Sequence, residues 1–334
     1  MQTNFKLPPV RLNPNGELRR VGFEIEFSGL TLEKIDHLLL ELFDGELTKK
    51  EKYKHIISTS YGEFEAILDF QFLTKREIFN WFLQNGFEDR DFYEFLEDVE
   101  SFIADVSSIV VPYEITTPPI LIEELDIVET IKEKLKQNGA KGTGSSLFYA
   151  FGLHINPEVY SFETGEIVDI LRAYFLLEEL IEEILDPDLT RKLTPYIDPF
   201  DEGYKKLITD PNYKPTQSEF ITTYITHNPT RNRSLDLLPL FTYLDEELVR
   251  SFLPKEKIGK RPTFHFRLPN SKVDEEGWYI YNSWNSWVLI ERLAFNKEVL
   301  QELLKEYQRY LNSLLSPTGK KRYRQKVLEC LIRL

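Results

Sequence analysis

The stretch Val21-Gly-Phe-Glu-Ile-Glu-Phe27 alternates apolar and acidic residues, and four later stretches of the chain repeat this alternation of apolar and polar residues. As a β-strand it has two unlike faces, because successive side chains point to opposite sides. Three apolar side chains share one face and two carboxylates share the other: Phe23, Ile25 and Phe27 against Glu24 and Glu26. Adjacent carboxylates repel each other unless a cation lies near both, and a hard divalent metal ion prefers oxygen ligands. A surface strand with solvated glutamates is the alternative.

Composition limits the function classes. The chain has 334 residues, of which 42% are hydrophobic, enough for a large core. A net charge of −14 argues against a nucleic-acid partner, since phosphate binding needs clustered Lys and Arg. The single cysteine, Cys330, excludes an internal disulfide and a thiolate metal cluster. The N-terminal residues resemble no signal peptide and no apolar run reaches membrane-spanning length, so we expect a cytoplasmic protein with no membrane partner.

Four later stretches repeat the alternation of the first strand. Each places apolar side chains on one face and polar ones on the other, and the second ends at Pro118-Pro119. These predicted strands lie within Tyr61–Phe70, Val110–Pro119, Leu147–Asn156 and Arg261–Asn270.

Amphipathic segments between the strands predict helices. Gly45, Gly86 and Gly139 are expected to close three of them, because glycine often ends a helix. The segment from Pro187 to Pro215 is expected to be a loop. The predicted helices span Thr31–Phe43, Thr74–Gly86, Asp89–Val106, Ile122–Gln137, about Glu166–Leu185, and much of the chain from Trp284 onward.

The domain organisation is predicted to be simple. Residues 1–19 contain three prolines and no periodic pattern, and we interpret them as an extended arm. No repeat, low-complexity tract or linker divides residues 20–334, so we predict one domain there, with a helical C-terminal part at about 284–334.

The polar strand faces carry mainly acids and imidazoles, and lysine is absent from them. An antiparallel sheet often leaves one face wet, so ordinary solvated groups are one interpretation. A multi-metal site for a phosphorylated ligand is the other, and we favour it. The residues concerned are Glu24, Glu26, Glu65, Asp69, Glu114, His154, Asn156, His265 and Arg267.

Other motifs are less specific. The loop that contains Gly144 and Ser145 lacks P-loop spacing, and a plain turn is the alternative to a phosphate cradle. His37 on the first helix and His55 in a loop are interpreted as structural. An Arg-rich turn places Arg231, Arg233 and Asp236 at the start of a helix, with His227 nearby.

The segments GFEIEF, PYEITTPP, FGLHINP, NRSLDLLPLF and TFHFRLP, in this order, resemble the amidoligase family. These are carboxylate–amine ligases of the glutamine synthetase and glutamate–cysteine ligase fold group, and the resemblance covers about residues 20–300. It implies an α+β fold whose curved, mainly antiparallel sheet carries the active site on its open face, with helices on the other. It also implies that Mg²⁺ and ATP phosphates are bound by Glu24, Glu26, Glu114 and His154, and that Arg267 meets phosphate.

Two positions depart from the family pattern. His265 stands where the family usually has Glu, and Asn156 stands where it often has a second His. Imidazole suits Mn²⁺ or Zn²⁺ better than Mg²⁺, so the metal preference at His265 is open.

The resemblance implies ATP-dependent amide formation through an acyl phosphate, with small-molecule or peptide carboxylate and amine substrates. Arg267 and Arg233 would stabilise the transferred phosphoryl group, and Asp69 or Glu65 would accept a proton from the amine. Gly144, Ser145, His154 and Asn156 complete the expected nucleotide contacts.

Two alternatives remain. One is a degenerate family member that binds a nucleotide or peptide without catalysis, and the His265 departure favours it. The other is a metal-dependent hydrolase, against which the lack of an H-E-x-x-H motif argues.

Overall fold

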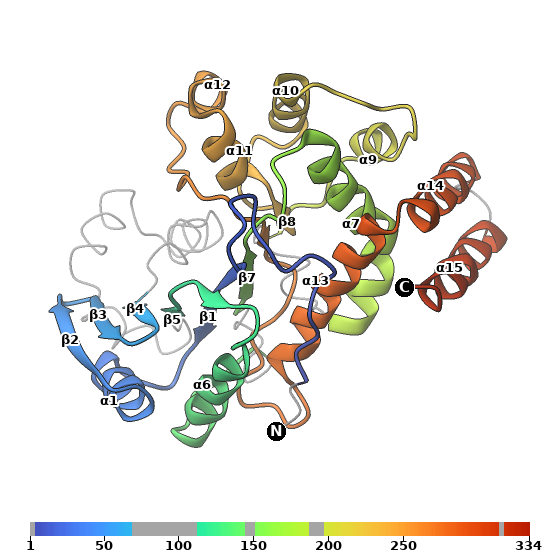
Figure 1. The fold of residues 1–334 in the computed structure, drawn as a ribbon. Coiled ribbons are helices and arrows are strands. Elements are labelled where there is room, and N and C mark those ends of the chain that lie inside the picture. The colour runs from blue at the N-terminus through green and yellow to red at the C-terminus, as the bar shows by residue number, and fades with distance from the viewer. Residues whose placement is uncertain (1–3, 69–111, 144–150, 187–196, 314–316) are drawn as a thin grey trace, which may run out of the picture.

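A computed structural model describes residues 4–68, 112–143, 151–186, 197–313 and 317–334 (Figure 1). The predicted helices within Thr74–Gly86 and Asp89–Val106 lie outside these residues, as do Asp69, Gly144 and Ser145. No described helix is long and apolar enough to cross a bilayer.

The described strands form one antiparallel sheet, in the order β2-β3-β4-β5-β1-β7-β9-β8, with β6 also paired to β1. The first strand of the sequence lies near the middle of this order. The strands are β1 (Arg20–Phe27), β2 (Gly45–Lys50), β3 (Lys54–Thr59), β4 (Gly62–Leu68), β5 (Tyr113–Thr116), β6 (Ile120–Leu121), β7 (Leu153–Pro157), β8 (Leu235–Asp236) and β9 (His265–Phe266).

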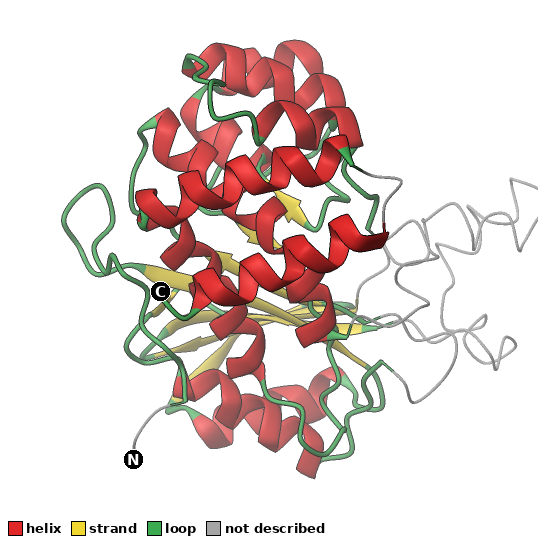
Figure 2. Cartoon of the chain, turned by 90° about the vertical axis from the view of Figure 1, so that its right-hand side faces the viewer, coloured by secondary structure: helices red, strands yellow, loops and turns green. Residues whose placement is uncertain are grey.

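Helices surround the strands and complete an α+β fold. Seen from the side in Figure 2, helices lie above and below the strand layer. They are α1 (Leu32–Leu42), α6 (Asp126–Gln137), α7 (Thr164–Leu185), α9 (Glu202–Ile208), α10 (Gln217–His227), α11 (Leu238–Leu244), α12 (Glu246–Phe252), α13 (Ile280–Phe295), α14 (Lys297–Asn312) and α15 (Pro317–Leu331).

The apolar face of the sheet forms the core. Phe23, Ile25 and Phe27 of β1 are fully buried, and burying each such side chain contributes roughly 1.5–3 kcal/mol. Trp287 of α13 packs its ring against Phe266 with the centroids 5.8 Å apart. This packing leaves the opposite faces of these strands to carry the polar side chains, which confirms the predicted alternation.

The N-terminal arm is fastened to α13. The indole of Trp284 donates to the backbone oxygen of Lys6 at 2.7 Å. Arg19, the residue before β1, makes a bidentate ion pair with Glu291, with N–O distances of 2.8 and 2.6 Å, and both side chains are buried. The ion pair thus connects the entry of the central strand to the helix behind it.

Several predicted elements differ from the structure. Gly45 does not close α1, which ends at Leu42; Gly45 begins β2, where a Cβ would lie 2.4 Å from the backbone oxygen of Ser58. Strands β2, β3, β6 and β8 and helices α10 and α12 were not predicted, and α9 lies inside the predicted loop Pro187–Pro215. Asp236 lies in β8 rather than at the start of a helix, which begins at Leu238. His55 lies in β3 rather than a loop, where its Nδ1 lies 2.8 Å from the Asp36 carboxylate of α1.

Candidate functional site

The register of the sheet brings the predicted polar residues onto one face. Glu26 lies directly opposite Glu114, and Glu24 lies opposite His154. Directly opposite residues of antiparallel strands point to the same side, with Cα atoms only about 4.5–5.5 Å apart. The predicted proximity of the Glu26 and Glu114 carboxylates is therefore supported by the register.

Glu24 is the hub of this face. Its two carboxylate oxygens lie 2.7 Å from His154 Nδ1 and 2.8 Å from Asn156 Nδ2. Burial by itself would raise the pKa of Glu24, but the hydrogen bond and charge of His154, with the charge of Arg267, lower it well below its usual value. In the tautomer of His154 that donates Nδ1–H to the ionised Glu24 carboxylate, Nε2 is left as an acceptor.

Glu26 and Glu114 form the acidic end of the face. Glu26 accepts a hydrogen bond from the backbone N–H of Gly152 at 2.7 Å, and Glu114 accepts one from the Thr116 hydroxyl at 2.8 Å. In the described part of the chain, no three His, Cys, Asp or Glu side chains gather as a closed metal site would require. Mg²⁺ at nucleotide sites is often held by only one or two carboxylates plus phosphates, and this pair fits that pattern.

Glu65, a predicted proton acceptor, lies further along the same face. Its carboxylate accepts from Lys54 Nζ at 2.7 Å, and both side chains are partly exposed. The ammonium group already engages this carboxylate, which weakens the case for Glu65 as the group that receives a proton from the amine.

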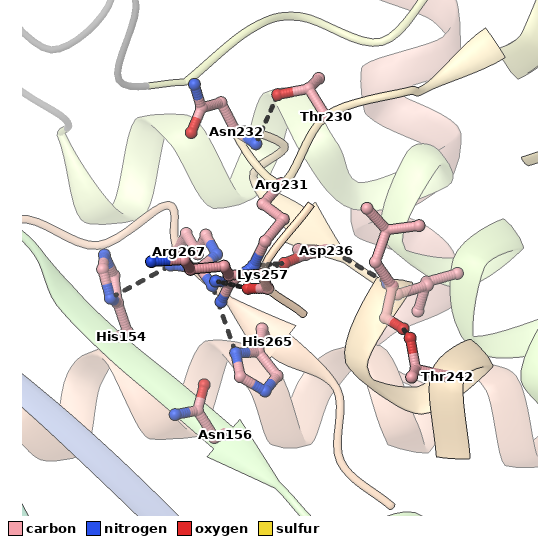
Figure 3. Close-up of polar contacts among 12 residues, drawn as sticks. His154, Asn156, Thr230, Arg231, Asn232, Asp236, Thr242, Lys257, His265 and Arg267 are labelled. Carbon is pink, nitrogen blue, oxygen red and sulfur yellow. Dashed lines mark hydrogen bonds and ion pairs between the residues drawn. The ribbon is translucent and has the colours of Figure 1, made fainter. Parts of the chain in front are cut away.

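Arginines form the opposite end of the face, directly after β9 and before β8 (Figure 3). Asp236 is fully buried, and its Oδ1 accepts from the backbone N–H of Leu238 at 2.9 Å. Its Oδ2 lies 3.4 Å from Arg267 Nη2 and 3.6 Å from Arg231 Nε. Burial raises the pKa of Asp236, and the guanidinium charges of Arg267 and Arg231 oppose that shift.

His265 lies beside Arg267, with Nδ1 3.3 Å from Arg267 Nη2 (Figure 3). A guanidinium only donates, so Nδ1 is the acceptor and Nε2 carries the proton of the neutral ring. Burial and the charge of Arg267 lower the pKa of His265 well below its usual value, and this outweighs the opposite effect of Glu24. A neutral imidazole is the form that binds metals, but the Arg267 guanidinium beside this ring would repel a cation bound to it, which weighs against the predicted metal role of His265.

Arg233, the second predicted phosphate ligand, faces elsewhere. Its guanidinium donates to the backbone oxygens of Pro199, at 2.5 Å, and His227, at 3.4 Å. It also lies over the ring of Phe200, 5.6 Å from the centroid. These contacts indicate a structural role for Arg233 rather than the predicted phosphoryl contact, whereas Arg231 lies beside Asp236.

Which arginine reaches the face could not be decided from the sequence. Arg231 and Arg233 are two residues apart in an irregular segment, so no strand or helix period assigns their directions. Asp236 carried a usable signal, because it is a charged residue inside the apolar run Leu235-Asp-Leu-Leu-Pro-Leu-Phe241.

Comparison with known proteins gives one match. A protein-family model described as "Putative amidoligase enzyme" matches residues 17–289, about four fifths of the chain, and so includes every residue of the polar face. No curated protein and no solved structure matches the chain.

Proposed function

Because this chain belongs to the amidoligase family, we propose that it is an ATP-dependent carboxylate–amine ligase that works through an acyl phosphate. The carrying observation is the register that lines up Glu114, Glu26, Glu24 and His154 across adjacent strands. Arg267 extends this row, with Nη1 3.4 Å from His154 Nδ1. This row has carboxylates at one end and a guanidinium at the other. Such polarity suits a substrate whose phosphates need a cation on one side and an arginine on the other.

In the proposed first half-reaction, a substrate carboxylate oxygen attacks the γ-phosphorus of ATP and ADP leaves. Glu26 and Glu114 would hold a divalent cation, which neutralises charge on the phosphate oxygens. Arg267 donates to the oxygens of the transferred phosphoryl group, where charge accumulates in the transition state.

In the second half-reaction, the amine attacks the acyl carbon, phosphate leaves with the C–O bonding electrons, and the amine nitrogen loses a proton. We assign that proton to Nε2 of His154. Glu24 holds the ring through Nδ1 at 2.7 Å, and Asn156 holds the second oxygen of Glu24 at 2.8 Å. This arrangement orients an imidazole base through a carboxylate, as general-base catalysis needs.

The second candidate function is nucleotide or peptide binding without catalysis. It is favoured by the neutral His265, which stands where the family usually has a carboxylate. The two functions differ in one observable, because a binder takes up ATP without forming ADP.

The test is ATP turnover by the full chain with Mg²⁺ or Mn²⁺, against pooled amino acids, short peptides and amines. Hydroxylamine is included because it converts an acyl phosphate to a hydroxamate that is detected by its iron complex. A ligase forms ADP only when a suitable carboxylate is present. ATP binding without ADP formation under every condition would contradict the ligase function and support the binding function.

Variants connect the turnover to the polar face. Glu26→Gln should lose most ADP formation while retaining its circular dichroism spectrum. Glu46→Gln is the matched control, since Glu46 is an exposed strand carboxylate on β2 at the edge of the sheet. Equal ADP formation by the Glu26→Gln and Glu46→Gln variants would show that Glu26 has no role in the reaction.

A further inference from the structure

Two arginines share one buried carboxylate at the β8–β9 end of the polar face. Asp236 Oδ2 lies 3.4 Å from Arg267 Nη2 and 3.6 Å from Arg231 Nε, and the Asp236 side chain is fully buried. The other oxygen, Oδ1, is fixed by the backbone N–H of Leu238 at 2.9 Å, at the start of α11. Asp236 thus provides a rigid anchor that brings two guanidiniums from separate segments together.

The two guanidiniums are held at this anchor without being sealed from solvent. The side chain of Arg231 is 34% exposed and that of Arg267 is 13% exposed, whereas Asp236 is inaccessible. Arg231 is fixed further by donation from Nη1 to the backbone oxygen of Lys257 at 3.2 Å. Figure 3 shows both guanidiniums beside Asp236, with His154 next to Arg267.

Two guanidiniums face one carboxylate at this anchor, so it carries a net positive charge, although the chain as a whole carries −14. The segment that Arg231 contacts, Lys255-Glu-Lys-Ile-Gly-Lys-Arg261, contains four basic residues and one acid. The ring of His265 registers the same field, because the guanidiniums of Arg267, Arg231 and Arg261 all lower its pKa in addition to burial. A local positive field on an acidic protein attracts anions selectively to this end of the face.

We propose that Arg231 and Arg267 form an oxyanion-binding subsite, with Asp236 as its positioning residue. The planar fork of arginine matches the geometry of phosphoryl and carboxylate oxygens, and two forks on one anchor can engage one oxyanion together. The inference rests on the proposed ligase function and adds to it a second arginine and the residue that positions both. The oxyanion comes either from the phosphates of ATP or from a carboxylate of the second substrate.

The binding test uses the full chain and needs no turnover. Inorganic phosphate, ATP and glutarate are titrated calorimetrically into wild type and Arg231→Gln at fixed salt. Loss of the charge-assisted hydrogen bonds should weaken one class of anion about tenfold or more. Weakening of phosphate and ATP assigns the subsite to a phosphoryl group, and weakening of glutarate assigns it to a substrate carboxylate.

Arg250→Gln is the matched control. Arg250 also holds the basic segment, donating to the backbone oxygens of Glu256 at 2.6 Å and Ile258 at 3.1 Å, but it has no contact with Asp236 among the described residues. This variant loses one positive charge and one tether of the segment, as Arg231→Gln does. If both variants bind every anion as wild type does, or lose affinity equally, the subsite is overturned.

The positioning role of Asp236 is tested by coupling. If Asp236 acts through Arg231, the effect of Arg231→Gln on anion affinity should shrink when it is made in an Asp236→Asn background. Additive effects would show that Asp236 is merely structural. If Asp236→Asn does not fold, the comparison of Arg231→Gln with Arg250→Gln still decides the subsite.

The subsite and the ligase function can fail separately. ADP formation by wild type with unaltered anion binding in Arg231→Gln would overturn the subsite alone. Anion binding that depends on Arg231, without ADP under any condition, would overturn the ligase function and leave the subsite in place.

Discussion

His265 should make the stability of the protein depend on pH in a way that His265→Asn removes. The side chain is 2% exposed, and its pKa lies well below the ordinary value because of burial and the Arg267 guanidinium. The folded state therefore resists protonation of this ring, whereas the unfolded chain accepts the proton with a pKa of about 6.5. The neutral ring contributes fully above that pH, and its contribution is lost as the pH falls toward the folded pKa.

The size of the effect follows from one proton. Below pH 6.5 the unfolded state binds one proton more than the folded state, which gives a limiting slope of about 1.4 kcal/mol per pH unit. Integration from pH 7.0 to 5.5 with an unfolded pKa of about 6.5 gives a loss of about 1.3 kcal/mol. Asn keeps an acceptor near the position of Nδ1 and does not titrate, so His265→Asn should not show this part of the loss.

The assay is urea unfolding of both proteins at pH 7.0, 6.5, 6.0 and 5.5. The difference in the free energy of unfolding between wild type and variant should narrow by about 1.3 kcal/mol over this range. His37→Gln, a change at an exposed position of α1, controls for removing a histidine elsewhere. Parallel pH curves for wild type and His265→Asn would refute the buried neutral ring and reopen a charged or metal-bound state for His265.

Two further predictions concern Arg19, which is buried against α13, and Arg267 on the polar face. Arg19→Met should lower the free energy of unfolding in urea by about 3–5 kcal/mol, because Glu291 remains buried without its ion-pair partner. Adding Glu291→Leu should recover much of that loss. A loss below about 1 kcal/mol for Arg19→Met would show that the pair is not a stabilising connection. The Arg267→Lys variant should fold, but its rate of ADP formation should fall by about 100-fold or more, because an ammonium group cannot reproduce the planar fork of arginine. Turnover close to wild type would show that Arg267 does not contact the transferred phosphoryl group.

The alternating strands were predictable because burial acts on every second residue. Phe23, Ile25 and Phe27 are all fully buried, so the sequence of β1 contains both the strand and its two faces. The pairing of Glu26 with Glu114 and Glu24 with His154 follows once the order of the strands is known. Periodicity alone could not identify the protein family. The resemblance of the ordered motifs to the amidoligase family did so, and the family-model match over residues 17–289 confirms it.

Strand β2 was not predictable in this way. Its residues, Gly45–Lys50, are largely exposed and include two lysines and a glutamate, so no apolar alternation marks them. Pairing with β3 positions this edge strand, and such pairing is a tertiary effect. The short strand β9 likewise pairs with β8, and the N–H of Arg267 continues their register by donating to the backbone oxygen of Ser234 at 2.8 Å.

The chemical state of the site depended on distant residues. The pKa of His265 is lowered by burial, by Arg267 two residues away, and by Arg231 and Arg261, which the fold brings nearby. Sequence spacing predicts neither these contacts nor which of Arg231 and Arg233 lies beside Asp236. Charge state and arginine direction are set by tertiary packing, which a single sequence does not encode as a local pattern.

The central claim, that a carboxylate is activated by ATP as an acyl phosphate, is tested most directly by oxygen transfer. The carboxylate substrate found in the turnover screen is labelled with ¹⁸O in both oxygens and incubated with ATP, the divalent cation and the amine. Activation through an acyl phosphate predicts one ¹⁸O atom in inorganic phosphate for each amide formed, because the attacking carboxylate oxygen leaves with the phosphoryl group. Unlabelled phosphate would contradict it and indicate hydrolysis of ATP by water, and ¹⁸O in AMP would indicate activation through an acyl adenylate instead.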